Sequence, residues 1–128
     1  MSNRDEEMKV GEILWRDLTV ENAVEVRDFY QEVVGWKSAP EDMEGYYDFH
    51  MSTSSGKRVA GICHARGMNK DIPPQWLIYI IVEDLDRSMS RCKELGGKVI
   101  AGPKDIGKSR YCVIQDPAGA VAALWKPG

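Results

Sequence analysis

Apolar residues in the first half of the chain recur at two spacings, one typical of strands and one typical of a helix. Residues 12–20 (EILWRDLTV) form an apolar run bounded by charged residues and predict a strand. Residues 22–34 carry apolar side chains at positions 23, 26, 29, 30, 33 and 34, which is helical spacing. Asn22 with Glu25 is a capping-box pattern for the start of this helix, and Gly35 is a typical C-terminal stop.

The remaining pattern completes this half of the chain and then repeats it. A hairpin of residues 46–53 and 57–65 is followed by a loop at residues 67–74, whose paired prolines mark a boundary. The second half predicts a strand at 76–82, a helix at 84–95 ended by two glycines, a strand at 98–103, and a hairpin of residues 110–116 and 120–126. We therefore interpret each half as a strand, a helix and three strands, although in the first half the pattern locates only the two hairpin strands after the helix.

The two halves also correspond residue by residue. Val20-Glu21-Asn22 matches Val82-Glu83-Asp84 and Gly35 matches Gly97, both at an offset of 62 (82 − 20 and 97 − 35). Phe49 matches Tyr111 at the same offset, and the two hairpin glycines, Gly56 and Gly119, are 63 apart. An offset that is nearly constant across a strand, a helix end and a hairpin indicates an internal repeat, although two unrelated α+β halves are the alternative.

Composition and charge restrict the class of protein. The chain has 128 residues and a net charge of −3, which suits one domain and argues against a nucleic-acid partner. It contains no apolar run long enough to span a membrane, and its charged first residues do not resemble a secretory signal. Cys63, Cys92 and Cys112 form no CxxC pair, so we expect reduced thiols and a cytoplasmic location.

With these modules in order, and with the closing segment DPAGAVAALW, the sequence resembles the vicinal oxygen chelate superfamily, which includes glyoxalase I, bleomycin-resistance proteins and extradiol dioxygenases. The resemblance implies an α+β fold in which two βαβββ modules form a curved mixed sheet, a half-open barrel around a cavity. It also implies a homodimer. We expect a flexible leader at residues 1–10 and a single domain at 11–127, made of module one (11–66), a linker (67–74) and module two (75–127).

Metal-using members of this family take ligands from the first and last strands of each module. The resemblance places these positions at Trp15, Ala60, Leu77 and Ala123, the last of them seven residues after Asp116 of the turn. None of the four side chains has a lone pair suited to a divalent ion. We therefore expect no metal and no other cofactor.

Strand alternation predicts which side chains share a face with these four positions. If all four positions face inward, the cavity contains three aromatic side chains and three polar ones: Trp15, Tyr79 and Trp125, and Asp17, Arg58 and His64. An apolar pocket with a few polar groups is the usual form of a small-molecule site. Cys63 alternates with His64 and should then face the helix.

Several of these side chains have a structural alternative to a role in ligand binding. Asp17 and Arg58 are as well explained by an ion pair between them, and His64 by a solvated position near a strand end. The tryptophans are able to plug the barrel, which would leave no cavity. His50 lies on a strand whose facing the pattern does not fix, and it is a candidate general base.

The predicted function is binding of a planar or apolar small molecule, without a metal, in the manner of bleomycin-resistance proteins. The alternative is an enzyme of the same superfamily, a lyase, isomerase or dioxygenase, which the fold alone supports.

Overall fold

The computed structural model describes residues 9–128, so most of the predicted leader, residues 1–10, lies outside the described part of the chain. The described chain divides into two compact units. The first unit is Trp15–Trp76, and the second is Leu77–Gly128 together with the residues that precede Trp15.

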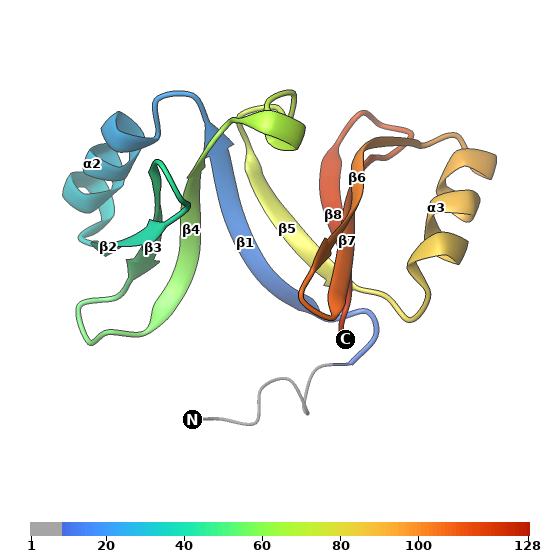
Figure 1. The fold of residues 1–128 in the computed structure, drawn as a ribbon, viewed down its shortest axis with the longest axis horizontal. Coiled ribbons are helices and arrows are strands. Elements are labelled where there is room, and N and C mark those ends of the chain that lie inside the picture. Colours follow the sequence, from blue (N-terminus) through green and yellow to red (C-terminus); the bar gives the residue numbers. More distant parts are fainter. Residues whose placement is uncertain (1–8) are drawn as a thin grey trace. The chain divides into compact units, whose positions relative to one another are not determined.

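The first unit contains one α-helix, a short 3-10 helix and a sheet of four strands (Figure 1). Its elements are β1 (Ile13–Val20), α2 (Ala23–Val34), β2 (Lys37–Asp42), β3 (Tyr47–Ser52), β4 (Arg58–His64) and the short 3-10 helix η1 (Gly67–Asn69). Hydrogen bonding orders the strands β2-β3-β4-β1. The pairs β2–β3 and β3–β4 are antiparallel, and β4–β1 is parallel.

The second unit repeats this arrangement with its own helix and strands (Figure 1). Its elements are β5 (Trp76–Ile81), α3 (Leu85–Glu94), β6 (Lys98–Ile106), β7 (Ser109–Gln115) and β8 (Val121–Lys126). The strand order is β5-β8-β7-β6, again with one parallel pair, β5–β8, between the first and last strands. Two βαβββ modules with mixed sheets confirm the predicted α+β fold class.

Each helix packs on one face of its own sheet, which we call the helix face; the opposite side is the far face. In the first unit Leu18, Val20, Phe49, Met51 and Ile62 are buried in a core that includes Val26 and Tyr30 of α2. In the second unit Leu124 and Cys112 pack with Leu85 and Met89 of α3. Side chains alternate along a strand, so the neighbours of these core residues lie on the far face.

The predicted C-terminal end of α2 is confirmed, whereas the predicted capping box at its N-terminal end does not form. Gly35 ends α2 in the left-handed conformation, with φ 84°, where glycine has no steric cost. Asn22 begins α2, but its side chain accepts no bond from the helix backbone. Its amide Nδ2 instead donates to Glu25 Oε1 at 3.0 Å, so the capping box is replaced by a side-chain pair.

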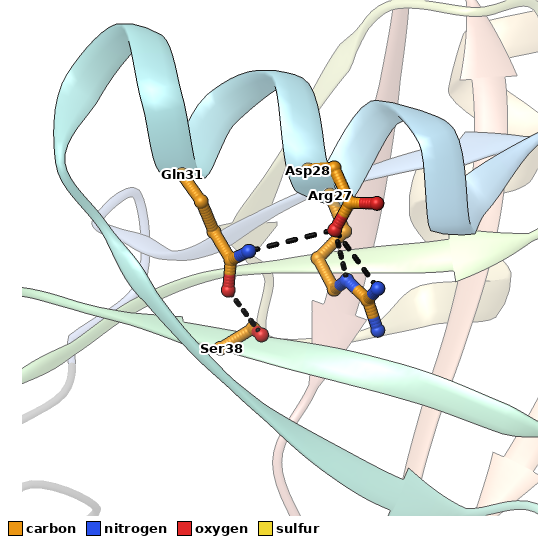
Figure 2. Close-up of polar contacts among 4 residues, drawn as sticks. All are labelled: Arg27, Asp28, Gln31 and Ser38. Atoms are coloured by element: carbon orange, nitrogen blue, oxygen red, sulfur yellow. Dashed lines mark hydrogen bonds and ion pairs between the residues drawn. The ribbon is translucent and has the colours of Figure 1, made fainter.

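Strand β2 is held against the helix by a chain of polar contacts (Figure 2). The Ser38 hydroxyl donates to Gln31 Oε1 at 2.6 Å, and Gln31 Nε2 donates to Asp28 Oδ1 at 3.5 Å. Arg27 binds the same carboxylate oxygen through its Nε and NH2 atoms. The strand itself is polar and mostly exposed, so these contacts replace the apolar packing that holds the other strands.

A glycine sets the close approach of α3 to its sheet and gives a first test of the fold. A Cβ added at Gly97 would lie 2.6 Å from Cys92 Sγ and 2.8 Å from the Gln115 carbonyl oxygen. We expect Gly97→Ala to lower the free energy of unfolding by about 1–3 kcal/mol, as overpacking does. Urea unfolding followed by circular dichroism measures this change.

Gly107→Ala is the control for this substitution, because nothing lies within 4 Å of a Cβ there and only the left-handed backbone, φ 58°, opposes the change. We expect it to cost about 1–2 kcal/mol, the penalty of a left-handed residue alone. A Gly97→Ala protein as stable as the parent would contradict the packing described here.

Candidate functional site

The parallel pairs fix which residues of the first and last strands stand side by side. Asp17 pairs with Gly61 in the first unit, and Tyr79 pairs with Ala123 in the second. The equivalent of Ala123 is therefore Gly61, at an offset of 62, and the predicted position Ala60 is wrong by one residue. Ala60 is buried in the core on the helix face, together with Ile62.

Trp15 and Asp17 share the far face of β1 and lie over Gly61. A Cβ added at Gly61 would come within 3.2 Å of the Asp17 Cβ and 3.7 Å of the Trp15 indole nitrogen. The absence of a side chain at Gly61 therefore lets the carboxylate-bearing residue and the indole approach the β4 backbone. This juxtaposition confirms that Trp15 and Asp17 lie on one face, as alternation predicted.

His50 lies in the same row of the far face, which its strand pattern did not reveal. Its partner on β4 is Gly61 and its partner on β2 is Ala39, so small residues stand on both sides of the imidazole. The ring Nε2 is 3.1 Å from Glu41 Oε1, and the His50 side chain is 20% exposed. The His50 imidazole is therefore held by a carboxylate and has small residues as its partners on both adjacent strands.

Cys63 lies beside this row, and the pKa of its thiol depends on the carboxylates nearby. It pairs with Thr19 on the far face, so the prediction that it faces α2 is wrong. Burial raises the pKa of the Cys63 thiol, and the carboxylates of Asp17, Asp48 and Glu41 raise it further. This part of the far face therefore has a negative potential, and the Cys63 sulfur is held as the unreactive neutral thiol.

His64 is placed apart from these residues, at the end of β4. Its backbone N–H donates to Asp48 Oδ1 at 2.9 Å, and its ring Nδ1 is 3.3 Å from the same oxygen. It also lines a shallow groove of about 500 Å³ with residues 21–25 and Asp28 at the start of α2. The contacts of His64 with Asp48 hold the end of β4 in place. The parallel partner of His64 is Val20, which belongs to the helix-side core.

Arg58 was assigned to the cavity by alternation from Ala60, but Ala60 faces the helix, so alternation no longer supports that assignment. A register shift between Met51 and Ser52 makes Arg58 the partner of Ser52, while Ala60 is the partner of Met51. A bulge of this kind breaks the strict alternation on which the assignment depended. Arg58 is exposed at the start of β4.

In the second unit three aromatic rings gather on the far face, as predicted for two of them. Tyr79 lies 6.2 Å from Trp125 and 6.0 Å from Tyr111, measured between ring centroids. Tyr111 and Trp125 are stacked, with an interplanar angle of 25°. Tyr111 was missed as a site residue because it was matched to Phe49, whereas the register matches it to Asp48. Tyr79 and Trp125 are half-buried and Tyr111 is buried.

None of the four positions that correspond to metal ligands has a side chain that binds metal ions: two are large and apolar, one is a methyl group and one is glycine. They are Trp15, Gly61, Leu77 and Ala123, and the last two are 1% and 0% exposed. Within residues 9–128 no group of three His, Cys, Asp or Glu side chains is arranged to hold a metal ion. The residues present do not fit the family's metal site.

Comparison with known proteins places the chain in a family. Residues 10–124 match the Glyoxalase/Bleomycin resistance protein/Dioxygenase superfamily. The chain belongs to this superfamily. It is 30% identical over 131 residues to the anthracycline biosynthesis protein DnrV of Streptomyces peucetius, an alignment that covers 92% of this chain and 48% of DnrV.

A further relative of this superfamily member supports the same placement, and a solved structure shares its fold. The putative glyoxylase CFP32 of Mycobacterium bovis is 32% identical over 123 residues, covering 94% of this chain and 47% of CFP32. The chain thus spans about half the length of the curated relatives that it matches. The fold is shared with a methylmalonyl-CoA epimerase variant of Streptomyces coelicolor, with a TM-score of 0.54, 15% identity and coverage of 94% of this chain and 99% of that one.

Within the described residues of this superfamily member, no helix is long and apolar enough to cross a membrane. The predicted ligand-binding roles of Trp15, Asp17, Arg58, His64, Tyr79 and Trp125, and their sharing of one cavity, stay predictions.

The residues at the four family positions lead to a test of metal binding. We expect the purified, dialysed protein to hold less than one equivalent of Zn, Ni, Fe or Mn, because carbon side chains cannot replace carboxylate and imidazole ligands. Elemental analysis by mass spectrometry measures the metal content. One equivalent that survives dialysis, and whose removal changes the environment of Trp15, would contradict this expectation.

The cysteines lead to a second test. Burial raises the pKa of Cys112 to about 11, and burial also raises that of Cys63. At pH 7.5 we expect both thiols of the native protein to react with Ellman's reagent more than about 100-fold more slowly than free cysteine, because the thiolate is the nucleophile.

Cys92→Ser is the control, because it removes the remaining thiol and should leave only the slow reactions. In urea all three cysteines of the parent protein should react rapidly with Ellman's reagent, as measured by the absorbance of the released thiolate. Rapid reaction of Cys63 in the native Cys92→Ser protein would show that its surroundings are not those described.

Proposed function

We propose that the protein is a metal-independent, small-molecule-binding member of the superfamily, and that the rings of Tyr79 and Trp125 form a platform for a planar or apolar ligand. The observation that carries this proposal is the aromatic cluster of the second unit, on the same strand face as Leu77 and Ala123. These positions carry metal ligands in relatives that use a metal. Here they are apolar, so they favour contact with apolar ligand surface over coordination chemistry.

The small residues beside the rings support a platform that a ligand can reach. Ala123 lies between Tyr79 on β5 and Val113 on β7, and its methyl group occupies less space than a branched chain. Trp125 is half-buried, so part of the indole surface is accessible in the second unit. Aromatic faces stack on planar groups in an offset or edge-on geometry, a contact worth about 0.5–1.5 kcal/mol beyond the buried area.

The chemical class of the ligand can be narrowed by the relatives' names. Two curated relatives are named for anthracycline biosynthesis, so anthracyclines belong in the first set of test ligands. A homodimer and a cytoplasmic location stay predictions of this proposal. The alternative, an enzyme of the superfamily, has separate support in the polar far face of the first unit, where His50 and Asp17 lie.

Substitution of Trp125 separates a ligand platform from a structural plug. A thermal-shift screen against aromatic metabolites and an anthracycline first identifies ligands that raise the unfolding temperature, since a ligand that prefers the native state stabilises it. We expect Trp125→Leu to abolish these shifts while the unliganded protein loses less than about 1 kcal/mol. A buried plug would instead cost about 3–5 kcal/mol when its ring is removed.

Trp36→Leu is the matched control, because Trp36 packs against the core of the first unit and contacts Tyr30 and Trp76. We expect this substitution to lower stability and to leave the ligand-induced shift in place. A large loss of stability in Trp125→Leu with unchanged ligand affinity would rule out the platform.

A further inference from the structure

A lysine continues the row of far-face side chains that contains two of the aromatic rings of the second unit. The register pairs Trp125 on β8 with Tyr111 on β7, and it pairs Tyr111 with Lys104 on the edge strand β6. Residues that pair directly across neighbouring strands project to the same face, with about 5 Å between their Cβ atoms. The pairing itself places Lys104, since the register of β6 shifts between Ala101 and Lys104 and simple alternation fails there.

The charge of Lys104 is not neutralised by the carboxylate next to it in the chain. Its side chain is exposed, and it makes no hydrogen bond or ion pair with any residue of the described range 9–128. The adjacent Asp105 accepts a hydrogen bond at Oδ1 from Arg110 Nε, at 3.0 Å. Arg110 also contacts Asp86 of α3 at 3.4 Å, so this ion pair belongs to the helix face and leaves Lys104 alone on the other side of β6.

The strands that form this face supply no carboxylate. Among the residues that the structure describes, the far-face positions of β5, β6, β7 and β8 carry neither Asp nor Glu. Glu12 is bonded through its backbone to Ile81 at the other end of the row, and its Oε1 accepts from the Lys9 N–H at 2.8 Å. Lys98 and Lys104 both pair with far-face residues of β7, so the far face of the second unit carries positive charge.

An unpaired ammonium beside an aromatic surface selects a ligand by its charge. Stacking on an indole favours a flat ligand, whatever charge the ligand carries on its edge. Trp125 and Lys104 are two strand spacings apart, about 10 Å between Cα atoms, and the flexible four-carbon stem of lysine shortens the gap that a ligand must span. An anionic group directed toward β6 would gain a charge-assisted hydrogen bond there, whereas a cationic group would meet like charge.

We propose that the ligand of the aromatic platform is a planar compound with an anionic group, such as an aromatic carboxylate, and that Lys104 binds this group. The inference rests on the proposed function, because it places the ligand on the rings of Tyr79 and Trp125. It adds the charge of the ligand and a residue that determines specificity. Aromatic carboxylates therefore come first among the metabolites to be screened.

Three naphthalene probes of similar shape test the charge preference without knowledge of the natural ligand. They are the anion naphthalene-2-carboxylate, the neutral naphthalene-2-carboxamide and the cation 2-naphthylmethylammonium. Isothermal titration calorimetry with the full chain at neutral pH and low salt measures each Kd. We expect the carboxylate to bind about fivefold more tightly than the carboxamide, and the cation to bind more weakly than both.

Substitutions of Lys104 change the charge on an exposed side chain and should leave the fold intact. Lys104→Met keeps the length of the side chain, and we expect it to weaken carboxylate binding about fivefold while the carboxamide Kd stays within about twofold. Lys104→Glu should reverse the order, so that the cation binds more tightly than the carboxylate. Lys98→Met is the matched control, because Lys98 is exposed on the same strand but pairs with Gln115, about 13 Å along β7 from Tyr111. It should leave all three Kd values within about twofold.

A salt titration of the unmodified protein provides a measurement that needs no variant. Salt screens exposed charges, so raising sodium chloride from about 0.05 M to about 0.5 M should reduce the advantage of the carboxylate to less than about twofold. The carboxamide Kd should change little over the same range. An advantage that is independent of salt, or that persists in Lys104→Met, would overturn the role of Lys104.

Trp125→Leu distinguishes failure of the charge preference from failure of the platform. Equal affinities of the carboxylate and the carboxamide, both lost in Trp125→Leu, would overturn the charge preference and leave the platform in place. No detectable binding of any probe, or binding that Trp125→Leu does not change, would overturn the platform and the role of Lys104 with it.

Discussion

The parallel pairing of the first and last strands in each unit is the constraint from which the other features of the site follow. Parallel strands cannot be joined by a tight turn, so the chain between them must cross over, and here it supplies a helix and two more strands. The helix covers one face of the sheet, and the register of the parallel pair then decides which residues face it. A slip of one residue would move every side chain of the strand to the other face.

The register also shows that the two units, which share one topology, have different side chains at equivalent positions of the far face. Equivalent far-face positions hold Asp17 and Tyr79 on the first strand, and His50 and Val113 on the strand next to the last. The first unit therefore places ionisable groups where the second places apolar and aromatic ones. The core residues that pack against the helices are apolar in both units, because each helix must bury its apolar stripe to be stable.

Most of the fold was predictable from the sequence, while the facing of individual strands was predictable only in part. Gly35 and the hairpin turns give local signals that no tertiary contact overrides. Strand β2 was not located, because its sequence KSAPED is polar and it is fixed by Ser38 and Gln31 and not by apolar burial. The facing of Ala60 was wrong because the offset of 63 between the hairpin glycines was extended to β4, whereas the parallel pairs keep 62.

His50 shows why the candidate site needed the structure. The segment YYDFHMST has apolar and polar residues on both faces, since Phe49 and Met51 are buried under α2 while Asp48 is also buried, so hydrophobicity alone does not choose a face. The pairing of Phe49 with Ile62 makes the choice, and it also separates His50 from His64, which the sequence could not rank. The facing of Tyr111 was missed for a related reason. The sequence repeat matched Tyr111 to Phe49, whereas the strand register matches it to Asp48, one residue earlier.

The packing around Gly61 opposes a metal-ligating side chain at this family position on β4. At Gly61 even a methyl group would approach the Asp17 Cβ to 3.2 Å, so a glutamate there would displace Asp17 or the Trp15 indole. The same glycine lets Asp17 and the Trp15 indole approach the β4 backbone, in a row of the sheet that also contains His50.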